Sequence, residues 1–292
     1  MPAIHPRRSV LYMPGSNARA IEKARSLPVD AVILDLEDAV APEAKASARE
    51  QVAAAVRAGG FGRREVVIRV NGAGTEWGHD DLVAAAASGA DAVLLPKVSD
   101  FDTIAAAELA LATARAPDRI RIWAMIETPL AILNAETIAR AARHETGRLA
   151  CFVLGTNDIA KETRARFVPG RWTMLPWLTT VVAAARAHDV DVLDGVYNDI
   201  GDADGFRAEC EQGRDLGMDG KTLIHPSQVE VANDVYAPSS NEIAAARAII
   251  AAFGEPGNAG KGVITLNGRM VERMHADMAA RTVALADAIA SA

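Results

Sequence analysis

Eight short apolar segments, most of them followed by a helix-like stretch, constrain the fold of this chain more than any other feature. Most of them lack a strict alternation of polar and apolar residues, which is typical of strands buried on both faces of a parallel sheet. The predicted strands are Ser9–Met13, Ala31–Leu36, Val66–Val70, Ala92–Leu95, Arg121–Ile126, Ala150–Leu154, Val190–Leu193 and Lys221–Ile224. Strand–helix alternation repeated eight times predicts a (β/α)8 TIM barrel.

Helix-like stretches lie between these strands. We expect helices at Ala44–Ala58, Phe101–Ala114, Pro129–Ala142, Trp177–Ala187 and Ala203–Leu216. Thr128 and Asp202 stand where N-capping residues are preferred, and Gly217 follows a helix end. A doubly wound open sheet is the main alternative. The sequence lacks the glycine-rich phosphate loop typical of that fold, and residues 71–74 (Asn-Gly-Ala-Gly) predict an ordinary loop.

The barrel is expected to occupy residues 1–236, and residues 237–292 to form a C-terminal helical extension. Within the extension a polar stretch with glycine and proline, residues 254–261, comes before a short run, Gly262–Leu266. One long helix, Met270–Ala290, is expected after it. We expect the extension to pack on a neighbouring subunit, which predicts a homo-oligomer, either a trimer or a hexamer.

Composition excludes several classes of protein. The net charge of −7 disfavours nucleic acid as the main partner, although a locally basic site could still bind a small anion. No segment approaches the ~18 apolar residues of a membrane helix, and the basic N-terminus lacks the apolar core of a signal peptide. We therefore expect a cytoplasmic protein without membrane partners. Cys151 and Cys210 have no metal-ligand spacing and are expected to be inert.

Two acidic residues follow two successive predicted strands. Glu127 comes directly after the strand Arg121–Ile126, and Asp158 lies just beyond Ala150–Leu154. The carboxyl ends of barrel strands share one mouth, so these two carboxylates can hold a hard divalent cation. Two histidines at helical spacing would indicate zinc or iron instead, and the sequence has no such pair. The pattern predicts a Mg²⁺ site.

The second and third predicted strands also end in charged residues. Asp35, Glu37 and Asp38 follow one another within four positions, and Arg69 lies inside an apolar strand. Buried charges are costly without partners, so these residues are expected either to bind a ligand or to pair with one another. The guanidinium fork of Arg69 suits a carboxylate, either that of a substrate or that of one of these acids. Both interpretations can hold at once.

Two further strand ends carry ionisable residues. Lys97 follows the fourth strand and could form a Schiff base, pair with a carboxylate or extend to the surface. His225 follows the eighth strand and could cap the next helix or line the mouth. No Gly-x-Ser-x-Gly motif and no Cys/His pairing is present, which disfavours nucleophilic hydrolysis.

Taken together, these segments give the chain a family resemblance. It resembles the citrate lyase β-subunit-like group of the HpcH/HpaI aldolase superfamily, which includes malyl-CoA, β-methylmalyl-CoA and citramalyl-CoA lyases. The matching motifs, in chain order, are RSVLYMPG at 8–15, DLEDAV at 35–40, IRVN at 68–71, LPK at 95–97, IET at 126–128, GTND at 155–158, GKTLIHPSQ at 220–228 and GRMVE at 268–272.

The resemblance implies roles at the barrel mouth. Glu127 and Asp158 would ligate Mg²⁺, and Arg69 would grip a carboxylate or carbonyl oxygen of the substrate. Asp38, with Glu37 or the acid at the end of the strand, would hold metal-bound water or steer the arginine. These assignments make the mouth a catalytic site for a CoA thioester.

The resemblance also implies residues that contact CoA. Arg19 and Lys23, with the His225 segment, would meet the CoA moiety, and Lys97 would lie near the same mouth. Several lyases of this type carry an aspartate in the C-terminal extension that reaches a neighbour's site as acid or base. Glu272 stands at that position here. Its extra methylene changes the reach of the carboxylate, and substrate preference or the catalytic step could differ accordingly.

The reaction expected from this resemblance is Mg²⁺-dependent carbon–carbon cleavage of a 3-hydroxy-acyl-CoA. The products would be acetyl- or propionyl-CoA and an α-keto acid. Two alternatives share the scaffold: hydrolysis of the thioester, and a citrate lyase β subunit that acts on a carrier-bound citryl thioester. A structural protein without activity would leave the acids and Arg69 unexplained.

Overall fold

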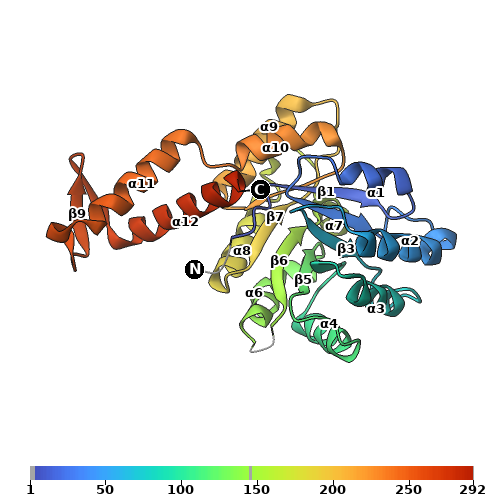
Figure 1. Ribbon diagram of the computed structural model, residues 1–292. Coiled ribbons are helices and arrows are strands. Elements are labelled where there is room, and N and C mark those ends of the chain that lie inside the picture. Colours follow the sequence, from blue (N-terminus) through green and yellow to red (C-terminus); the bar gives the residue numbers. More distant parts are fainter. Residues whose placement is uncertain (1–3, 145–146, 292) are drawn as a thin grey trace. The chain divides into compact units, whose positions relative to one another are not determined.

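Eight parallel strands close into a barrel in the order of the chain, with β1 paired to both β2 and β8 (Figure 1). The computed structural model describes residues 4–144 and 147–291. The strands are β1 Ser9–Pro14, β2 Ala31–Asp35, β3 Glu65–Arg69, β4 Ala92–Leu95, β5 Arg121–Ile126, β6 Leu149–Leu154, β7 Asp191–Asp194 and β8 Gly220–Leu223. The predicted TIM barrel is confirmed, and each predicted strand overlaps an observed one.

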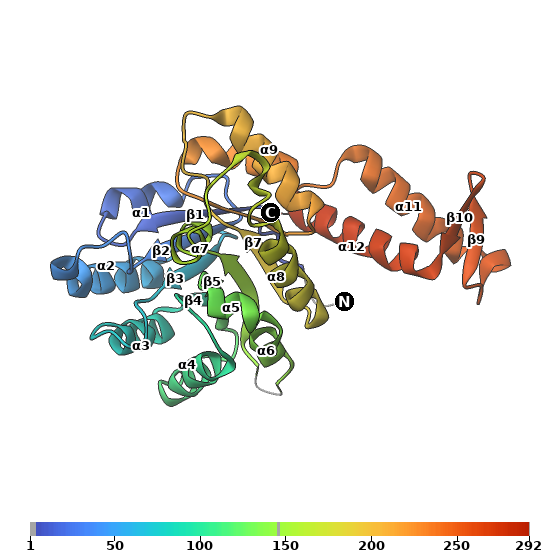
Figure 2. The same cartoon turned by 180° about the vertical axis from the view of Figure 1, so that it is seen from behind.

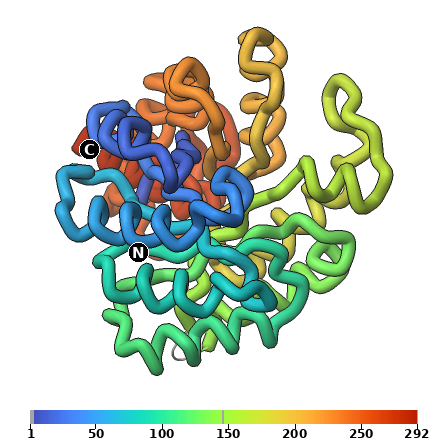
Figure 3. The backbone as a smooth tube through the Cα atoms, turned by 90° about the vertical axis from the view of Figure 1, so that its right-hand side faces the viewer, coloured from blue at the N-terminus to red at the C-terminus, as the bar shows by residue number. Residues whose placement is uncertain are grey.

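Helices surround the barrel and follow one another in chain order (Figure 3). They are α1 Ala18–Ala24, α2 Lys45–Ala58, α3 Gly78–Ser88, α4 Phe101–Thr113, α5 Pro129–Leu133, α6 Ala135–Ala139, α7 Thr156–Thr163, α8 Leu175–Ala187, α9 Ala203–Asp215 and α10 Val229–Val235. The Thr128 hydroxyl accepts a hydrogen bond from Ala131 N, and Asp202 caps α9 in the same way, as predicted. The single helix predicted over Pro129–Ala142 is wrong, because Asn134 leaves helical geometry (φ −98°, ψ 9°) and separates α5 from α6.

The interior of the barrel is filled by side chains from alternate positions of the strands. This core contains Val10, Ile33, Val67, Leu94, Trp123, Cys151, Val153 and Leu193. Branched aliphatic residues dominate it, as expected for a packed barrel rather than a pore. Cys151 and Cys210 are both buried and free, and burial raises the pKa of Cys210 to about 12. Neither thiol is activated.

The amino end of the barrel is closed by Arg7, which is buried. Its Nε and Nη2 atoms donate to the two carboxylate oxygens of Glu65 at 2.7 and 2.8 Å, and Nη1 donates to Asp191 at 2.6 Å. The guanidinium lies 4.9 Å from the centre of the Trp123 ring. Arg7 thereby contacts β3, β5 and β7 at the amino end of the barrel. This end lies opposite to the strand ends that carry Glu127 and Arg69.

Residues 234–291, with residues 4–6, form a second compact unit, whereas Arg7–Asn233 form the barrel unit. The second unit contains α11 Ser240–Gly254, β9 Val263–Leu266, β10 Arg269–Glu272 and α12 Arg273–Ala290. The hairpin β9–β10 lies at one end of the α11–α12 pair (Figure 2). Phe253, Ile264 and Val271 form a small core of their own. In the described part of the chain, no helix is long and apolar enough to cross a membrane.

The prediction of one helix from Met270 to Ala290 is wrong at its start. Met270 lies in β10, which pairs with β9 in antiparallel fashion, and the helix begins at Arg273. The reason is the turn between the strands. Asn267 and Gly268 both have positive φ (51° and 75°), the pairing that favours tight hairpins.

Candidate active site

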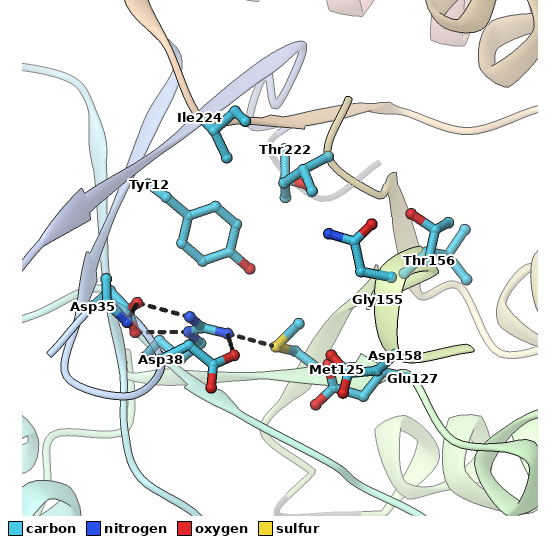
Figure 4. Close-up of a pocket in the computed structure, with 15 residues that line it drawn as sticks. Tyr12, Asp35, Asp38, Met125, Glu127, Gly155, Thr156, Asp158, Thr222 and Ile224 are labelled. Carbon is cyan, nitrogen blue, oxygen red and sulfur yellow. Dashed lines mark hydrogen bonds and ion pairs between the residues drawn. The ribbon is translucent and has the colours of Figure 1, made fainter. Parts of the chain in front are cut away.

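A cavity of about 330 Å³ opens among residues from the carboxyl ends of the strands, where active sites of this fold lie. One part of its lining is apolar and consists of Met125, Leu154, Val196 and Ile224. The ionisable and hydroxyl residues that line it are Tyr12, Asp35, Asp38, Arg69, Glu127, Thr156, Asp158 and Thr222 (Figure 4). Four of the predicted site residues therefore line one cavity: Asp38, Arg69, Glu127 and Asp158.

Glu127 is held in the cavity wall by backbone on two sides. Its Oε1 accepts a hydrogen bond of 2.7 Å from Lys97 N. On the other side lies Gly155, where an added Cβ would come within 2.4 Å of the Glu127 Cβ and 2.5 Å of Oε2. Burial raises the pKa of Glu127 to about 7, against the lowering effect of the Lys97 hydrogen bond, and the nearby Asp158 adds to the rise. The site thus holds an acid that a bound cation would deprotonate.

Asp158 lies in the first turn of α7 and is more exposed than Glu127. Figure 4 shows the two carboxylates next to each other on the same wall of the cavity. Among the residues that the structure describes, no group of three or more His, Cys, Asp or Glu side chains could hold a metal ion. Two carboxylates beside an open cavity fit Mg²⁺, which keeps several waters or substrate oxygens among its ligands. They do not fit a closed structural zinc site.

Arg69 also lines the cavity and pairs with the acids at the end of β2 and just after it. Its Nε and Nη2 donate to the two oxygens of Asp35, both at 2.7 Å, and Nη1 lies 2.8 Å from Glu37 Oε2. Asp38 Oδ2 is 3.5 Å from the same Nη1. Burial alone would lower the pKa of Arg69, but the hydrogen bond to Asp35 and the nearby groups Tyr12, Asp35 and Glu37 together outweigh it and raise the pKa, so the guanidinium stays charged. The internal ion pair expected as one of two interpretations is confirmed.

The two acids after Asp35 have different surroundings. Asp38 is two-thirds exposed and lines the cavity, whereas the carboxylate of Glu37 is largely buried against Arg69. Burial raises the pKa of Glu37, against the lowering effect of Arg69, and Asp38 adds to the rise. Of the two, Asp38 is the carboxylate positioned to contact a substrate or water in the cavity.

Lys97 does not have the environment of an imine-forming lysine. Its side chain is about half exposed and its Nζ lies 3.6 Å from Asp158 Oδ1. Burial alone would lower the pKa of Lys97, but Asp158 and then Glu127 outweigh this effect and raise it. A Schiff-base lysine needs a depressed pKa to provide the neutral amine. Lys97 is therefore a charged partner of the proposed metal ligands.

The remaining predicted residues lie outside the cavity lining. His225 caps the short 3-10 helix Pro226–Gln228: its Nδ1 is 2.7 Å from Ser227 Oγ and accepts from Ser227 N at 3.2 Å. This is the capping alternative left open by the sequence. Arg19 and Lys23 are exposed on α1. Glu272 belongs to the second unit, where its N–H donates to His275 Nδ1 at 2.9 Å at the start of α12.

Several residues that line or support the site were not predicted from the sequence. Tyr12 stacks on the Arg69 guanidinium, with 5.0 Å from its ring centre to Cζ, and its hydroxyl points toward the cavity in Figure 4. Thr156 and Thr222 add hydroxyls to the same lining. Behind the acidic loop, Lys45 and Asn71 form a buried network described below. The signal for Tyr12 was its place near the carboxyl end of β1, where an inward-facing polar side chain lies at the mouth.

Comparison with known proteins agrees with this geometry. Residues 8–226 match the HpcH/HpaI aldolase/citrate lyase family. The chain is 50% identical over 288 residues to a (3S)-malyl-CoA thioesterase of Cereibacter sphaeroides, covering 98% of this chain and 97% of the relative. It is 35% identical over 271 residues to the citrate lyase subunit beta of Escherichia coli, covering 91% and 88%.

A solved structure extends the likeness to the full length of the fold. The CitE protein of Mycobacterium tuberculosis, crystallised with magnesium, acetoacetate and coenzyme A, aligns with a TM-score of 0.76 at 27% identity. The alignment covers 98% of this chain and all of that chain. The barrel, the clustered strand-end acids and these relatives lead to one conclusion: the chain belongs to the HpcH/HpaI aldolase/citrate lyase family.

Proposed function

We propose that the protein hydrolyses a 3-hydroxy-acyl-CoA thioester of the malyl-CoA type in a Mg²⁺-dependent reaction. The observation that carries the substrate class is the cavity itself, which is lined by two candidate metal-ligand carboxylates and by a charged arginine. The choice of reaction is supported by the half-identical relatives, which are malyl-CoA thioesterases. Carbon–carbon cleavage, the first expectation from the sequence, becomes the second candidate.

Glu127 and Asp158 are proposed to hold the metal. When bound, Mg²⁺ would polarise the substrate oxygens that it contacts and neutralise developing charge there. The backbone N–H of Lys97 orients Glu127, and the Lys97 ammonium adds positive charge beside Asp158. Solved relatives that contain magnesium support this assignment.

Arg69 and Asp38 are proposed to act on the reacting atoms. Arg69 is kept charged by its fork to Asp35, so it can stabilise negative charge on the thioester oxygen without reorganising. Asp38 is the general base: in hydrolysis it takes a proton from the water whose oxygen bonds to the thioester carbonyl carbon. The C–S bond then breaks, and the CoA thiolate takes that proton from Asp38 and leaves as the thiol. Glu37 contacts Nη1 of Arg69 and thereby orients the guanidinium.

Carbon–carbon cleavage uses the same groups in another order. Asp38 would take the proton of the substrate hydroxyl, and Arg69 would stabilise the thioester enolate that leaves. Glu272 of a neighbouring subunit would protonate that enolate to release acetyl- or propionyl-CoA. The citrate lyase β relatives favour this second candidate. Arg19, Lys23 and the His225 segment are proposed to contact CoA in either reaction.

The second unit is proposed to pack on a neighbouring subunit in a trimer or hexamer. It exposes several large apolar side chains, namely Val263, Met270, Met274 and Met278. Met274 and Met278 are one helical turn apart on α12, directly after the hairpin that carries Val263 and Met270, and neighbouring exposed apolar side chains are typical of an interaction surface. Light scattering of the purified protein tests this part: a monomer at micromolar concentration would contradict it.

A panel of CoA thioesters tests the reaction. Malyl-, methylmalyl-, citramalyl- and citryl-CoA are incubated with the protein and Mg²⁺, and free thiol and α-keto acid are measured separately. Thiol without keto acid supports hydrolysis, and keto acid without thiol supports the lyase. Turnover by neither route, with every substrate, would contradict both candidates.

Two matched variants connect the activity to the proposed metal site. Asp158→Asn removes one proposed ligand, and we expect activity to fall by about 10³-fold, the effect of losing ~4 kcal/mol of stabilisation. Glu162→Gln changes an exposed acid four residues further along α7 and should retain full activity. Equal effects of the two substitutions would refute the assignment.

A further inference from the structure

Lys45 is a buried ammonium that donates three hydrogen bonds, all to uncharged oxygens. Its Nζ donates to the backbone carbonyls of Leu36 and Glu37, both at 3.0 Å, and to Asn71 Oδ1 at 2.7 Å. These three bonds use every donor that an ammonium has. The indole of Trp77 lies 5.1 Å from Nζ. No carboxylate is among the three acceptors, so within residues 4–144 and 147–291 the buried charge has no direct counterion contact.

The position of Lys45 in the fold makes this arrangement costly. The residue is the first of α2, and a cation at a helix N-terminus opposes the helix dipole. Its burial also removes the ammonium from water, with only 6% of the residue exposed. A side chain of this kind is a poor choice for stability alone, and its contacts indicate what it does instead.

Further hydrogen bonds hold Asn71, the side-chain partner of Lys45, in place. Asn71 donates its Nδ2 both to Leu36 O at 2.9 Å and to Asp81 Oδ2 at 2.6 Å, and its backbone N donates to the same Asp81 oxygen at 3.0 Å. Asp81 is fully buried and accepts from Arg49 Nε at 2.6 Å. The Leu36 carbonyl therefore accepts from two side chains that are themselves held in place.

The backbone segment that Lys45 holds carries Glu37 and Asp38, the two acids proposed to act in the site. On its other side the Asp35 carboxylate accepts from Glu37 N at 2.9 Å and from Ala39 N at 3.0 Å. The loop is thus held by an ammonium at its carbonyls and by a carboxylate at its N–H groups. Asp38 lies between these two sets of bonds, so its direction into the cavity depends on both.

We propose that Lys45 is a positioning residue of the active site, which fixes the backbone of residues 36–39 and thereby aims Asp38 into the cavity and Glu37 at Arg69. The positioning is a property of the loop itself. Its effect on turnover rests on the proposed function, in which Asp38 is the base. The two parts are tested separately.

Hydrogen exchange tests the positioning without any assumption about the reaction. Lys45→Met keeps the unbranched stem and removes the three donors, so the amides of Glu37 and Ala39 should exchange about tenfold faster or more. Arg148→Met is the matched control, because Arg148 is also buried and donates to backbone carbonyls, those of Pro117 and Ile120 at 2.8 and 3.0 Å. No acceleration in Lys45→Met, or the same acceleration in both variants, overturns the proposal.

A double-mutant cycle tests the effect on turnover. Lys45→Met should lower kcat by about 10–100-fold, as loss of a supporting contact does, while KM stays within about threefold. In an Asp38→Asn background the same substitution should change kcat by less than about threefold. Once the carboxylate of Asp38 is gone, the orientation of residue 38 no longer affects the rate. Independent losses would show that Lys45 acts elsewhere. A wild-type protein inactive on every CoA thioester would refute the proposed function and leave the exchange result to decide the positioning.

Discussion

Arg7 and Arg69 lie at opposite ends of the same barrel and are bound in nearly the same way. Each guanidinium donates two hydrogen bonds to one carboxylate, Arg7 to Glu65 and Arg69 to Asp35, at 2.7 to 2.8 Å. Each also reaches a second acid through Nη1 and lies over an aromatic ring at about 5 Å. Both residues are 7% exposed. Residue type, burial and pairing therefore do not distinguish them.

What differs is the space around the two groups. Arg7 stacks on Trp123, which is fully buried within the core, and joins the amino ends of the strands. Arg69 stacks on Tyr12, lines the cavity and has a third acid, Asp38, within 3.5 Å. One cluster closes the barrel and the other leaves a charged edge facing an opening. A buried ion pair acquires a chemical role only where the fold leaves room for a ligand beside it.

The largest expected effect comes from removing each arginine in turn. Arg69→Met should lower kcat by about 10²–10³-fold, because the preorganised charge at the reacting oxygen is lost. Arg7→Met should lower the free energy of unfolding by about 3–5 kcal/mol, since it removes the guanidinium that pairs with the largely buried carboxylate of Glu65, but kcat of the folded protein should stay within about threefold. Urea unfolding and kcat are measured on both variants. A comparable loss of kcat in Arg7→Met would erase the distinction between the two ends.

A smaller effect is expected at Gly155. The methyl group of Gly155→Ala would overlap Glu127, which must turn away from its bond to Lys97 N. We expect kcat to fall by about 10–100-fold and the affinity for Mg²⁺ to fall with it. Gly72→Ala, where a Cβ meets nothing within 4 Å, is the control and should be active. Full activity of Gly155→Ala with unchanged Mg²⁺ binding would argue against Glu127 as a ligand.

The pH dependence of stability tests the carboxyl end of the barrel alone. In metal-free protein the pKa of Glu127 is raised from 4.5 to about 7, so the folded state holds this proton more tightly than the unfolded state. The contribution of Glu127 to the free energy of unfolding is fully present below pH 4.5. It is lost as pH rises from 4.5 toward about 7, which lowers the free energy of unfolding by up to ~3 kcal/mol. Urea unfolding with a chelator, from about pH 5 to 8, should show this decline relative to Glu127→Gln. A constant difference between the two proteins contradicts it.

The smallest effect is expected for Tyr12→Phe. The phenylalanine ring keeps the stacking on Arg69, so stability should change by less than about 1 kcal/mol. Only the hydroxyl that faces the cavity is lost, and kcat should fall by less than about tenfold. Steady-state kinetics with the preferred thioester measure it. A loss as large as that of Arg69→Met would give Tyr12 a direct part in the chemistry.

Much of the fold was predictable because barrel strands are apolar along their whole length. The same logic led to the site, since a charge at the end of such a strand or just after it lies at the mouth: Glu127, Asp158, Asp38 and Arg69 were all found in this way and all line the cavity. Their roles remain proposals. The tail was predicted less well, although Asn267 and Gly268 are a hairpin signal that the expectation of a long helix ignored.

Other features left no readable trace in one sequence. Arg7 precedes the first strand, and its partners Glu65 and Asp191 begin distant strands, so only the closed barrel brings them together. Lys45 is similar: it resembles an ordinary surface residue at a helix start, and its contact with Asn71 spans 26 positions. Contacts of this kind depend on three-dimensional closure rather than on local pattern.

The bond that orients Glu127 comes from a peptide N–H and not from a side chain. Every amino acid except proline supplies that donor, and residues that tolerate the positive φ of position 97 (50°), such as glycine, asparagine and unbranched side chains, keep the anchor. The side chain at position 97 can therefore change without loss of this hydrogen bond, and the charge beside the cavity changes with it. Evolution or a protein engineer can retune which anions the enzyme accepts at this position while leaving the support of Glu127 intact.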